Sequence, residues 1–312
     1  MPKTVVVALG GNAIIQPKQK GTAAEQRENI QTTARQISAL VRGGYRVIVT
    51  HGNGPQVGNI LIQQEEGAGV VPPMPLDVCG AKSQGYLGYM LQQALSNELK
   101  AAGLDATAVT IVTQVAVDPQ DKAFADPTKP VGPFYTEERA RELEAAKGWR
   151  MKEDAGRGWR RVVASPDPKR IVEAEAIRAI VRTGAVVIAC GGGGIPVHES
   201  AAGLSGLEAV IDKDLAGERL AQEVEADILL ILTDVEQAAI NYRQPGETWL
   251  GTITVAEARR YQAEGHFRAG SMGPKMEAAV RFTANGGEFA LITSLDKATA
   301  ALAGRTGTRI VP

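Results

Sequence analysis

The chain of 312 residues is 44% hydrophobic and 22% charged, which is typical of a soluble globular protein with one large domain or two lobes. Its 34 basic and 35 acidic residues nearly cancel, so no global charge favours nucleic acid or an anionic membrane as a partner. Two distant cysteines, three scattered histidines and the lack of a run of ~18 apolar residues exclude a disulfide framework, a multi-histidine metal site and a membrane helix, and we expect a cytoplasmic protein.

Short apolar runs rich in β-branched residues recur along the chain and are bounded by turn residues. Such runs are typical of strands that are buried on both faces of a parallel sheet. The predicted strands are 3–9, 45–50, 106–112, 185–190, 227–233 and 288–293.

The segments between these runs have apolar residues at the 3 to 4 spacing of an amphipathic helix. Asp77 is a candidate N-cap, and glycines supply the stops at the other ends. The predicted helices are 25–44, 77–103, 167–184 and 274–287. Alternation of strands and helices predicts a doubly wound α/β fold.

One region, about 118–163, is polar and rich in Pro, Gly, Lys and Arg. It breaks the alternation, so we predict an excursion from the sheet, with a short helix and a small hairpin. We expect Trp149 and Trp159 to pack this excursion against itself, because aromatic side chains are mostly core.

Glycine-rich turns follow three predicted strands, at 9–13, 51–58 and 190–196. The dinucleotide spacing G-x-G-x-x-G fails at Val57 and Pro196, and the pattern G-x-x-x-x-G-K-[ST] does not occur. A single turn of this kind could simply be tight. Three at the carboxyl ends of parallel strands favour a ligand site in which backbone N–H groups meet an anion. His51, at the border of the second turn, is interpreted as structural.

Two lysines lie where helices are predicted to begin. Lys213 stands between Asp212, which could cap the helix, and Asp214, which could hold lysine side chains in position. Lys275 lies in the first turn of its helix, where a cation opposes the helix dipole unless an anion is bound nearby. Both could be solvated surface charges. Together with the N–H groups of the glycine turns, however, the two lysines would supply the electrostatic clamp that phosphoryl transfer needs around the transferred group.

With these residues assembled, the sequence resembles the amino-acid kinase superfamily, and within it the carbamate kinases. Seven motifs carry the resemblance in chain order: "ALGGNAI", "THGNGPQVG", "DPTKPVGPFY", "GGGGIPV", "EAVIDKDLA", "LLILTDV" and "GSMGPKMEAA". The resemblance implies an open, mainly parallel sheet of about eight strands between helices, with 118–163 as a protruding subdomain, in a homodimer. It also implies the reaction ATP + carbamate ⇌ ADP + carbamoyl phosphate, with Mg²⁺ carried by the nucleotide.

Residue roles follow from the same resemblance. It implies that one domain, 1–312, has a carbamate-binding part at about 1–195 and a nucleotide-binding part at about 196–312. Lys213 and Lys275 would stabilise the transferred phosphoryl group, Asp214 would orient them, and Lys129 would reach the acceptor. The implied substrate-binding residues are Gly10, Gly11, Asn12, Gly52, Asn53, Gly54, Gly192 and Gly193. The implied nucleotide-binding residues are Thr233, Asp234, Tyr242, Ser271 and Met272.

Carbamate is already an anionic oxygen nucleophile, so this reaction needs no catalytic base. Two other functions stay open: a sister kinase that phosphorylates another carboxylate or a phosphomonoester, and a nucleotide-binding regulator without turnover. The physiological direction also stays open. Synthesis of ATP during arginine catabolism is the first hypothesis, and synthesis of carbamoyl phosphate is the second.

Overall fold

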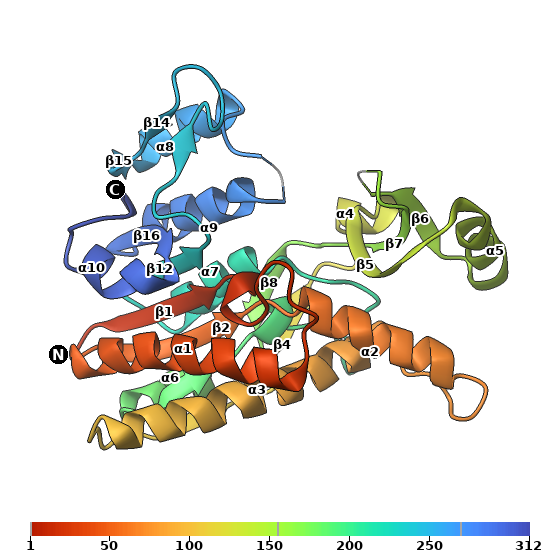
Figure 1. The fold of residues 1–312 in the computed structure, drawn as a ribbon, viewed down its shortest axis with the longest axis horizontal. Coiled ribbons are helices and arrows are strands. Elements are labelled where there is room, and N and C mark those ends of the chain that lie inside the picture. Colours follow the sequence, from red (N-terminus) through yellow and green to blue (C-terminus); the bar gives the residue numbers. More distant parts are fainter. Residues whose placement is uncertain (1, 155, 269) are drawn as a thin grey trace.

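The computed structural model describes residues 2–154, 156–268 and 270–312 and has an eight-stranded sheet between two layers of helices (Figure 1). The strand order is β15-β17-β16-β12-β1-β2-β9-β3, and every neighbouring pair is parallel except β16 with β17. The strands are β1 Thr4–Leu9, β2 Arg46–His51, β3 Ala108–Thr110, β9 Val186–Ile188, β12 Ile228–Thr233, β15 Thr252–Thr254, β16 Phe289–Ser294 and β17 Thr308–Val311.

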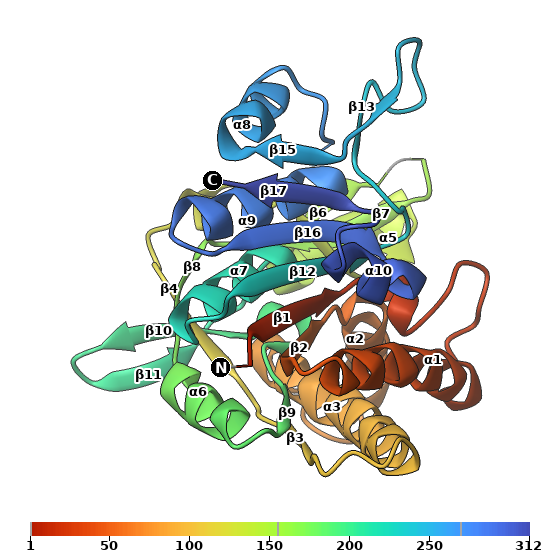
Figure 2. The ribbon, with the colours of Figure 1, turned by 90° about the vertical axis from the view of Figure 1, so that its left-hand side faces the viewer.

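Helices cover both faces of this sheet, as Figure 2 shows. One layer contains α1 Ala23–Arg42, α3 Leu76–Ala101 and α10 Ala298–Leu302, and the other contains α6 Ala174–Arg182, α7 Lys213–Glu223, α8 Val255–Ala263 and α9 Met272–Ala284. Successive side chains of a strand point to opposite faces. In β1, Val5 and Val7 therefore pack into one layer and Val6 and Ala8 into the other. The continuous apolar run predicts this two-sided burial.

The excursion is a small separate layer that projects from the body of the molecule (Figure 1). Its strands β5 Lys129–Tyr135, β6 Arg150–Glu153 and β7 Trp159–Val163 form an antiparallel sheet in the order β5-β7-β6, flanked by α4 Lys122–Ala125 and α5 Glu137–Lys147. Trp149 and Trp159 lie within it, under the guanidinium groups of Arg161 and Arg141 at 4.5 and 4.4 Å. Their packing role is therefore confirmed.

A second sheet joins the excursion to the body. Its order is β11-β10-β4-β8, with β4 Gln114–Val117, β8 Pro168–Ile171, β10 Ile195–Ser200 and β11 Gly203–Gly206. The remaining elements are η1 Gly11–Ala13, α2 Gly54–Gly67, η2 Gly191–Gly193, β13 Ala239–Ile240, β14 Thr248–Trp249 and η3 Leu295–Lys297.

Several predicted boundaries were wrong. The predicted strand 106–112 is reduced to β3, because the chain then leaves the main sheet and pairs as β4. The predicted helix 167–184 begins only at Ala174, because its first residues form β8 against β4. Asp77 lies inside α3, whose N-cap is Pro75. Within the described residues, no helix is long and apolar enough to cross a membrane.

Candidate active site

Four adjacent strands, β12, β1, β2 and β9, end at the same edge of the main sheet because they are parallel. The three glycine turns follow β1, β2 and β9 at this edge, and α2 and α7 begin there. A cavity of about 720 Å³ lies here between the body and the excursion, and we call it the larger cavity. Ligands of open α/β sheets bind at this edge, where helix N-termini supply free N–H groups.

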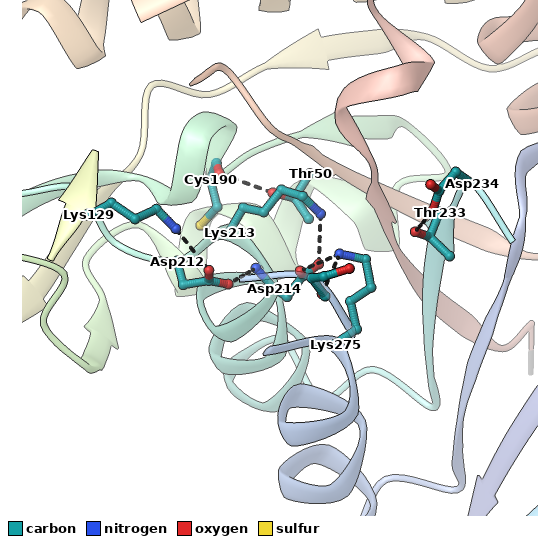
Figure 3. Close-up of polar contacts among 10 residues, drawn as sticks. Thr50, Lys129, Cys190, Asp212, Lys213, Asp214, Thr233, Asp234 and Lys275 are labelled. Atoms are coloured by element: carbon teal, nitrogen blue, oxygen red, sulfur yellow. Dashed lines mark hydrogen bonds and ion pairs between the residues drawn. The ribbon is translucent and has the colours of Figure 1, made fainter. Parts of the chain in front are cut away.

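The predicted lysines meet at the larger cavity, although they come from three elements (Figure 3). Lys213 begins α7, and its Nζ lies 2.7 Å from Oδ1 of Asp214. Lys275 lies in the first turn of α9, and its Nζ lies 3.2 Å from Oδ2 of the same carboxylate. Asp214 therefore holds both ammonium groups side by side, as the sequence predicted.

Asp214 remains an anion in spite of its burial. Its side chain is only 4% exposed. Burial alone would raise the pKa of this carboxyl, but the charges and hydrogen bonds of Lys213 and Lys275 hold the pKa below its ordinary value. Two cations against one anion leave a net positive charge between the two lysines, which is the charge that an incoming phosphoryl group needs.

Asp212 links the excursion to the body. Its Oδ1 accepts the backbone N–H of Asp214 at 2.9 Å and so caps α7, as predicted. Its Oδ2 accepts from Nζ of Lys129, the first residue of β5, at 3.0 Å. Lys129 thus reaches from the excursion to the base of the lysine cluster.

The glycine turns pack so closely that side chains would not fit at several positions. A Cβ on Gly10 would lie 2.8 Å from the carbonyl oxygen of Leu232. Gly192 has φ +70°, and a Cβ there would collide with the buried side chain of Asn53. Gly11 and Gly54 have open space, so their glycines leave backbone accessible to a ligand.

The predicted substrate residues fall into three groups. Gly11, Gly52, Asn53, Gly54 and Gly192 line the larger cavity together with Lys129, Lys213, Asp214 and Lys275. Gly10 and Asn12 line a neighbouring cavity of about 540 Å³, which we call the connecting cavity. Gly193 lies outside the lining of both, with φ +97°, and a Cβ there would strike the carbonyl oxygen of Ile211.

His51 is buried beneath these turns, at 1% exposure. Burial, assisted by the charge of Lys213, lowers its pKa to about 4, so the imidazole is neutral at pH 7. Its Nδ1 lies 2.9 Å from the carbonyl oxygen of Gly52, and this contact fixes the second turn. The geometry supports the structural interpretation of this histidine.

All five predicted nucleotide residues line a further cavity of about 420 Å³, which we call the smaller cavity. Tyr242 and Trp249 stand edge to face there, with ring centroids 6.0 Å apart, and are 37% and 46% exposed. Ser271 and Lys275 line both the smaller and the larger cavity, and the connecting cavity shares Thr233 and Asp234 with the smaller one. Figure 3 shows Lys275 between these two residues and Lys129.

Sequence reasoning missed other residues that line these cavities. Arg157, Arg160 and Lys20 line the larger cavity, and His266 lines the smaller one. No motif marks them, and the only signal for the two arginines was the basic composition of the excursion. In the part of the chain that the structure describes, no three His, Cys, Asp or Glu side chains form a group that could hold a metal ion.

The arrangement is suited to the transfer of a negatively charged group between two ligands. The larger cavity offers cations and backbone N–H groups, and the smaller one offers aromatic and polar side chains. Lys275, which lines both, lies where a group would pass from one ligand to the other.

Comparisons with known proteins agree with this geometry. Residues 3–294 match the amino acid kinase family. The chain is 58% identical to a carbamate kinase of Pyrococcus horikoshii over 100% of both chains, and 59% identical to one of Thermococcus kodakarensis over 99% of both. A solved structure, carbamate kinase from Giardia lamblia bound to AMP-PNP, superposes with a TM-score of 0.95 at 51% identity, covering 99% of this chain and 98% of that one. The chain therefore belongs to the amino acid kinase family, and within it to the carbamate kinases.

Proposed function

We propose that the protein catalyses reversible phosphoryl transfer between ATP and carbamate, giving ADP and carbamoyl phosphate. The observation that carries the proposal is the placement of Lys213 and Lys275 on one buried carboxylate, between a cationic cavity and an aromatic one. The carbamate kinases among its relatives support the choice of substrates.

The nucleotide would lie in the smaller cavity, with its base near Tyr242 and its phosphates directed toward Ser271 and Lys275. Carbamate would lie in the larger cavity near Gly52 and Asn53. A carbamate oxygen attacks the γ-phosphorus, a new O–P bond forms, and the bond to the β-phosphate oxygen breaks. The electron pair of that bond stays on ADP, and no proton has to be removed from carbamate.

The protein contributes electrostatic stabilisation to this step. Negative charge spreads over the equatorial oxygens of the transferred group in the transition state, and Lys213 and Lys275 would stabilise it. Asp214 is a positioning residue, since it holds both ammonium groups without facing the substrate as a free anion. The beginnings of α7 and α9 add the positive ends of two helix dipoles.

Mg²⁺ would enter with the nucleotide. The carboxylates that line the larger cavity, Asp212 and Asp214, are each paired with lysine, which fits a metal held mainly by phosphate oxygens. When bound, the ion would neutralise part of the phosphate charge. The residues of the smaller cavity all follow residue 196, which supports a nucleotide-binding part at about 196–312. The larger cavity draws on both parts.

The proposal extends to the setting of the enzyme. Cys79 and Cys190 are free, buried thiols, which supports a reducing cytoplasm. We further propose a homodimer, because Tyr86 and Tyr89 leave apolar surface exposed on α3, and light scattering on the purified protein tests this. Arginine catabolism with net ATP synthesis is the proposed physiological direction, to be tested against carbamoyl phosphate synthesis by comparing both rates at cellular substrate concentrations.

A coupled assay in both directions tests the function. Purified protein should form ADP with carbamate and form ATP from carbamoyl phosphate and ADP, while glutamate, aspartate and acetylglutamate should give no product. Turnover with one of those amino acids instead would favour the sister kinase. Nucleotide binding without any turnover would favour the regulator and overturn the proposal.

A further inference from the structure

The larger cavity carries more positive charge than the catalytic lysines account for. Six cationic side chains line it, against the two carboxylates Asp212 and Asp214. Lys129, Lys213 and Lys275 pair with those carboxylates. The others, Arg157, Arg160 and Lys20, have no assigned role in the reaction.

The two arginines are held in a fixed arrangement on the excursion. Nη1 of Arg160 and Nη2 of Arg157 bind the same carboxylate, Asp154, at 3.3 and 3.0 Å. Nη2 of Arg160 also donates to the carbonyl oxygen of Gly132 at 3.0 Å. Both guanidinium groups lie over the ring of Phe134, at 5.1 and 5.0 Å from its centroid. Such stacking orients a guanidinium plane without neutralising it.

This arrangement leaves donors free for a ligand. Nη1 and Nη2 of Arg160 carry two N–H groups each and make one hydrogen bond each within the described residues, so each keeps a second N–H for a ligand. Asp154 balances one of the two positive charges and does not itself line the cavity. The pair therefore offers a net positive charge and a planar fork of donors, which suits the oxygens of a phosphate group.

We infer that Arg157 and Arg160 form an acceptor-side subsite that binds the phosphoryl group of an acyl phosphate both in the transition state of transfer and after transfer to the acceptor. The inference rests on the proposed function and deepens it. ATP would reach the lysines from the smaller cavity, so the arginines meet the phosphoryl group only as it moves into the larger one. Carbamate itself carries no phosphate, so its binding does not depend on this subsite.

The kinetic signature follows from that distinction. In the ATP-forming direction, Arg157→Gln should raise KM for carbamoyl phosphate about tenfold and leave kcat within about twofold, as for one lost charge-assisted contact. An enzyme variant cannot change the equilibrium constant of the reaction, so kcat/KM must fall by the same factor in the reverse direction. There it should lower kcat about tenfold with KM for carbamate unchanged, because the contact exists in the transition state but not with carbamate.

Matched variants keep the test interpretable. Arg157 is 62% exposed, so its replacement should not unfold the chain. Arg157→Lys should recover part of the loss by restoring charge without the fork, and Arg139→Gln, an exposed arginine of α5 paired with Glu142, should change nothing. Asp154→Asn should loosen both guanidinium groups and raise the same KM.

Calorimetric titration with inorganic phosphate separates this inference from the proposed function. Phosphate should bind the wild type about tenfold more tightly than Arg157→Gln, whether or not carbamate is the acceptor. If wild type turns over carbamate but Arg157→Gln matches it in phosphate affinity and in KM for carbamoyl phosphate, the subsite does not exist. A raised KM for carbamate alone would assign the arginines to the acceptor carboxylate and also overturn the inference.

Discussion

The larger and the smaller cavity share Lys275 but are built in different ways. The larger one is made of backbone turns at strand ends, of lysines at helix beginnings and of basic side chains from the excursion. The smaller one is made of side chains, with two exposed aromatic rings and a histidine from the connections around β13, β14 and α8. Under the proposed function, charge would be recognised at the sheet edge, and the shape of the nucleotide would be recognised by loops, where sequence change is tolerated.

The largest effect is expected when a positive charge is removed from the larger cavity. Lys213→Ala should lower kcat about 10³-fold, because one preorganised cation is lost at the transferred group. The dissociation constant of ADP, measured by calorimetry, should change less than threefold. Lys122→Ala, on the exposed surface of α4, is the control and should retain activity. Unchanged turnover in Lys213→Ala would show that the lysine cluster is not catalytic.

The stability of the protein should depend on pH through α7, which begins at the larger cavity and carries the buried carboxyl of Glu218. Burial raises the pKa of Glu218 to about 7 from 4.5, and Arg219 and Arg281 oppose this only in part. The folded state therefore binds this proton more tightly than the unfolded state, so stability falls as pH rises from about 4.5 to about 7.

Glu218→Gln should remove that loss. The variant should be up to about 3 kcal/mol more stable than wild type at pH 8, with the difference vanishing near pH 4.5. Urea unfolding at both pH values measures it, and the exposed Glu175→Gln serves as the control. An equal stability difference at both pH values would mean that folding does not raise the pKa of this carboxyl.

A methyl group at Gly192 tests whether the third glycine turn belongs to the larger cavity. Gly192→Ala should lower turnover about 100-fold through left-handed strain and the collision with Asn53, while ADP affinity falls less than threefold. Gly44→Ala, with φ +87° and open space, carries the strain alone and should stay active. Equal losses of turnover and of ADP binding would assign this turn to the nucleotide-binding site instead.

The smallest effect is expected in the smaller cavity. Tyr242→Ala should raise KM for ADP about tenfold, since stacking on an aromatic ring is worth about 1–3 kcal/mol, and should leave kcat nearly unchanged. Val70→Ala, at a side chain that is 88% exposed in the connection after α2, is the control. A loss confined to kcat would mean that Tyr242 acts on the reacting groups, and the division of tasks between the cavities would fail.

The sequence predicted the parts of the fold that local pattern determines. β1 and β12 have apolar residues on both faces, so burial and strand type could be inferred from adjacent residues. Pro168–Ile171 could not, because a strand of four residues is decided by its pairing with β4 and not by its own pattern. The helix α2 was missed because its first residues, Gly54 and Pro55, are also typical of a turn.

The site residues, too, could be predicted only where the local sequence marks them. Lys213 and Lys275 were predicted because each begins a helix, but only the packing of α7 against α9 brings them to one carboxylate. Arg157 and Arg160 lie among many exposed basic residues of the excursion, and nothing local distinguishes them. Their role depends on Asp154, Phe134 and the position of the whole small sheet over the cavity.

Asp212 and Asp214 give the site its own resident counter-ions. In the proposed mechanism, a phosphoryl group that approaches Lys129, Lys213 and Lys275 shares them with carboxylates that already bind them, and does not meet bare ammonium groups. Chloride and other singly charged anions should therefore bind poorly, because only a more highly charged anion is attracted strongly by lysines that are already paired. The cap on α7 uses a different oxygen of Asp212 from the one that holds Lys129, so a ligand that weakens the contact with Lys129 leaves the cap intact.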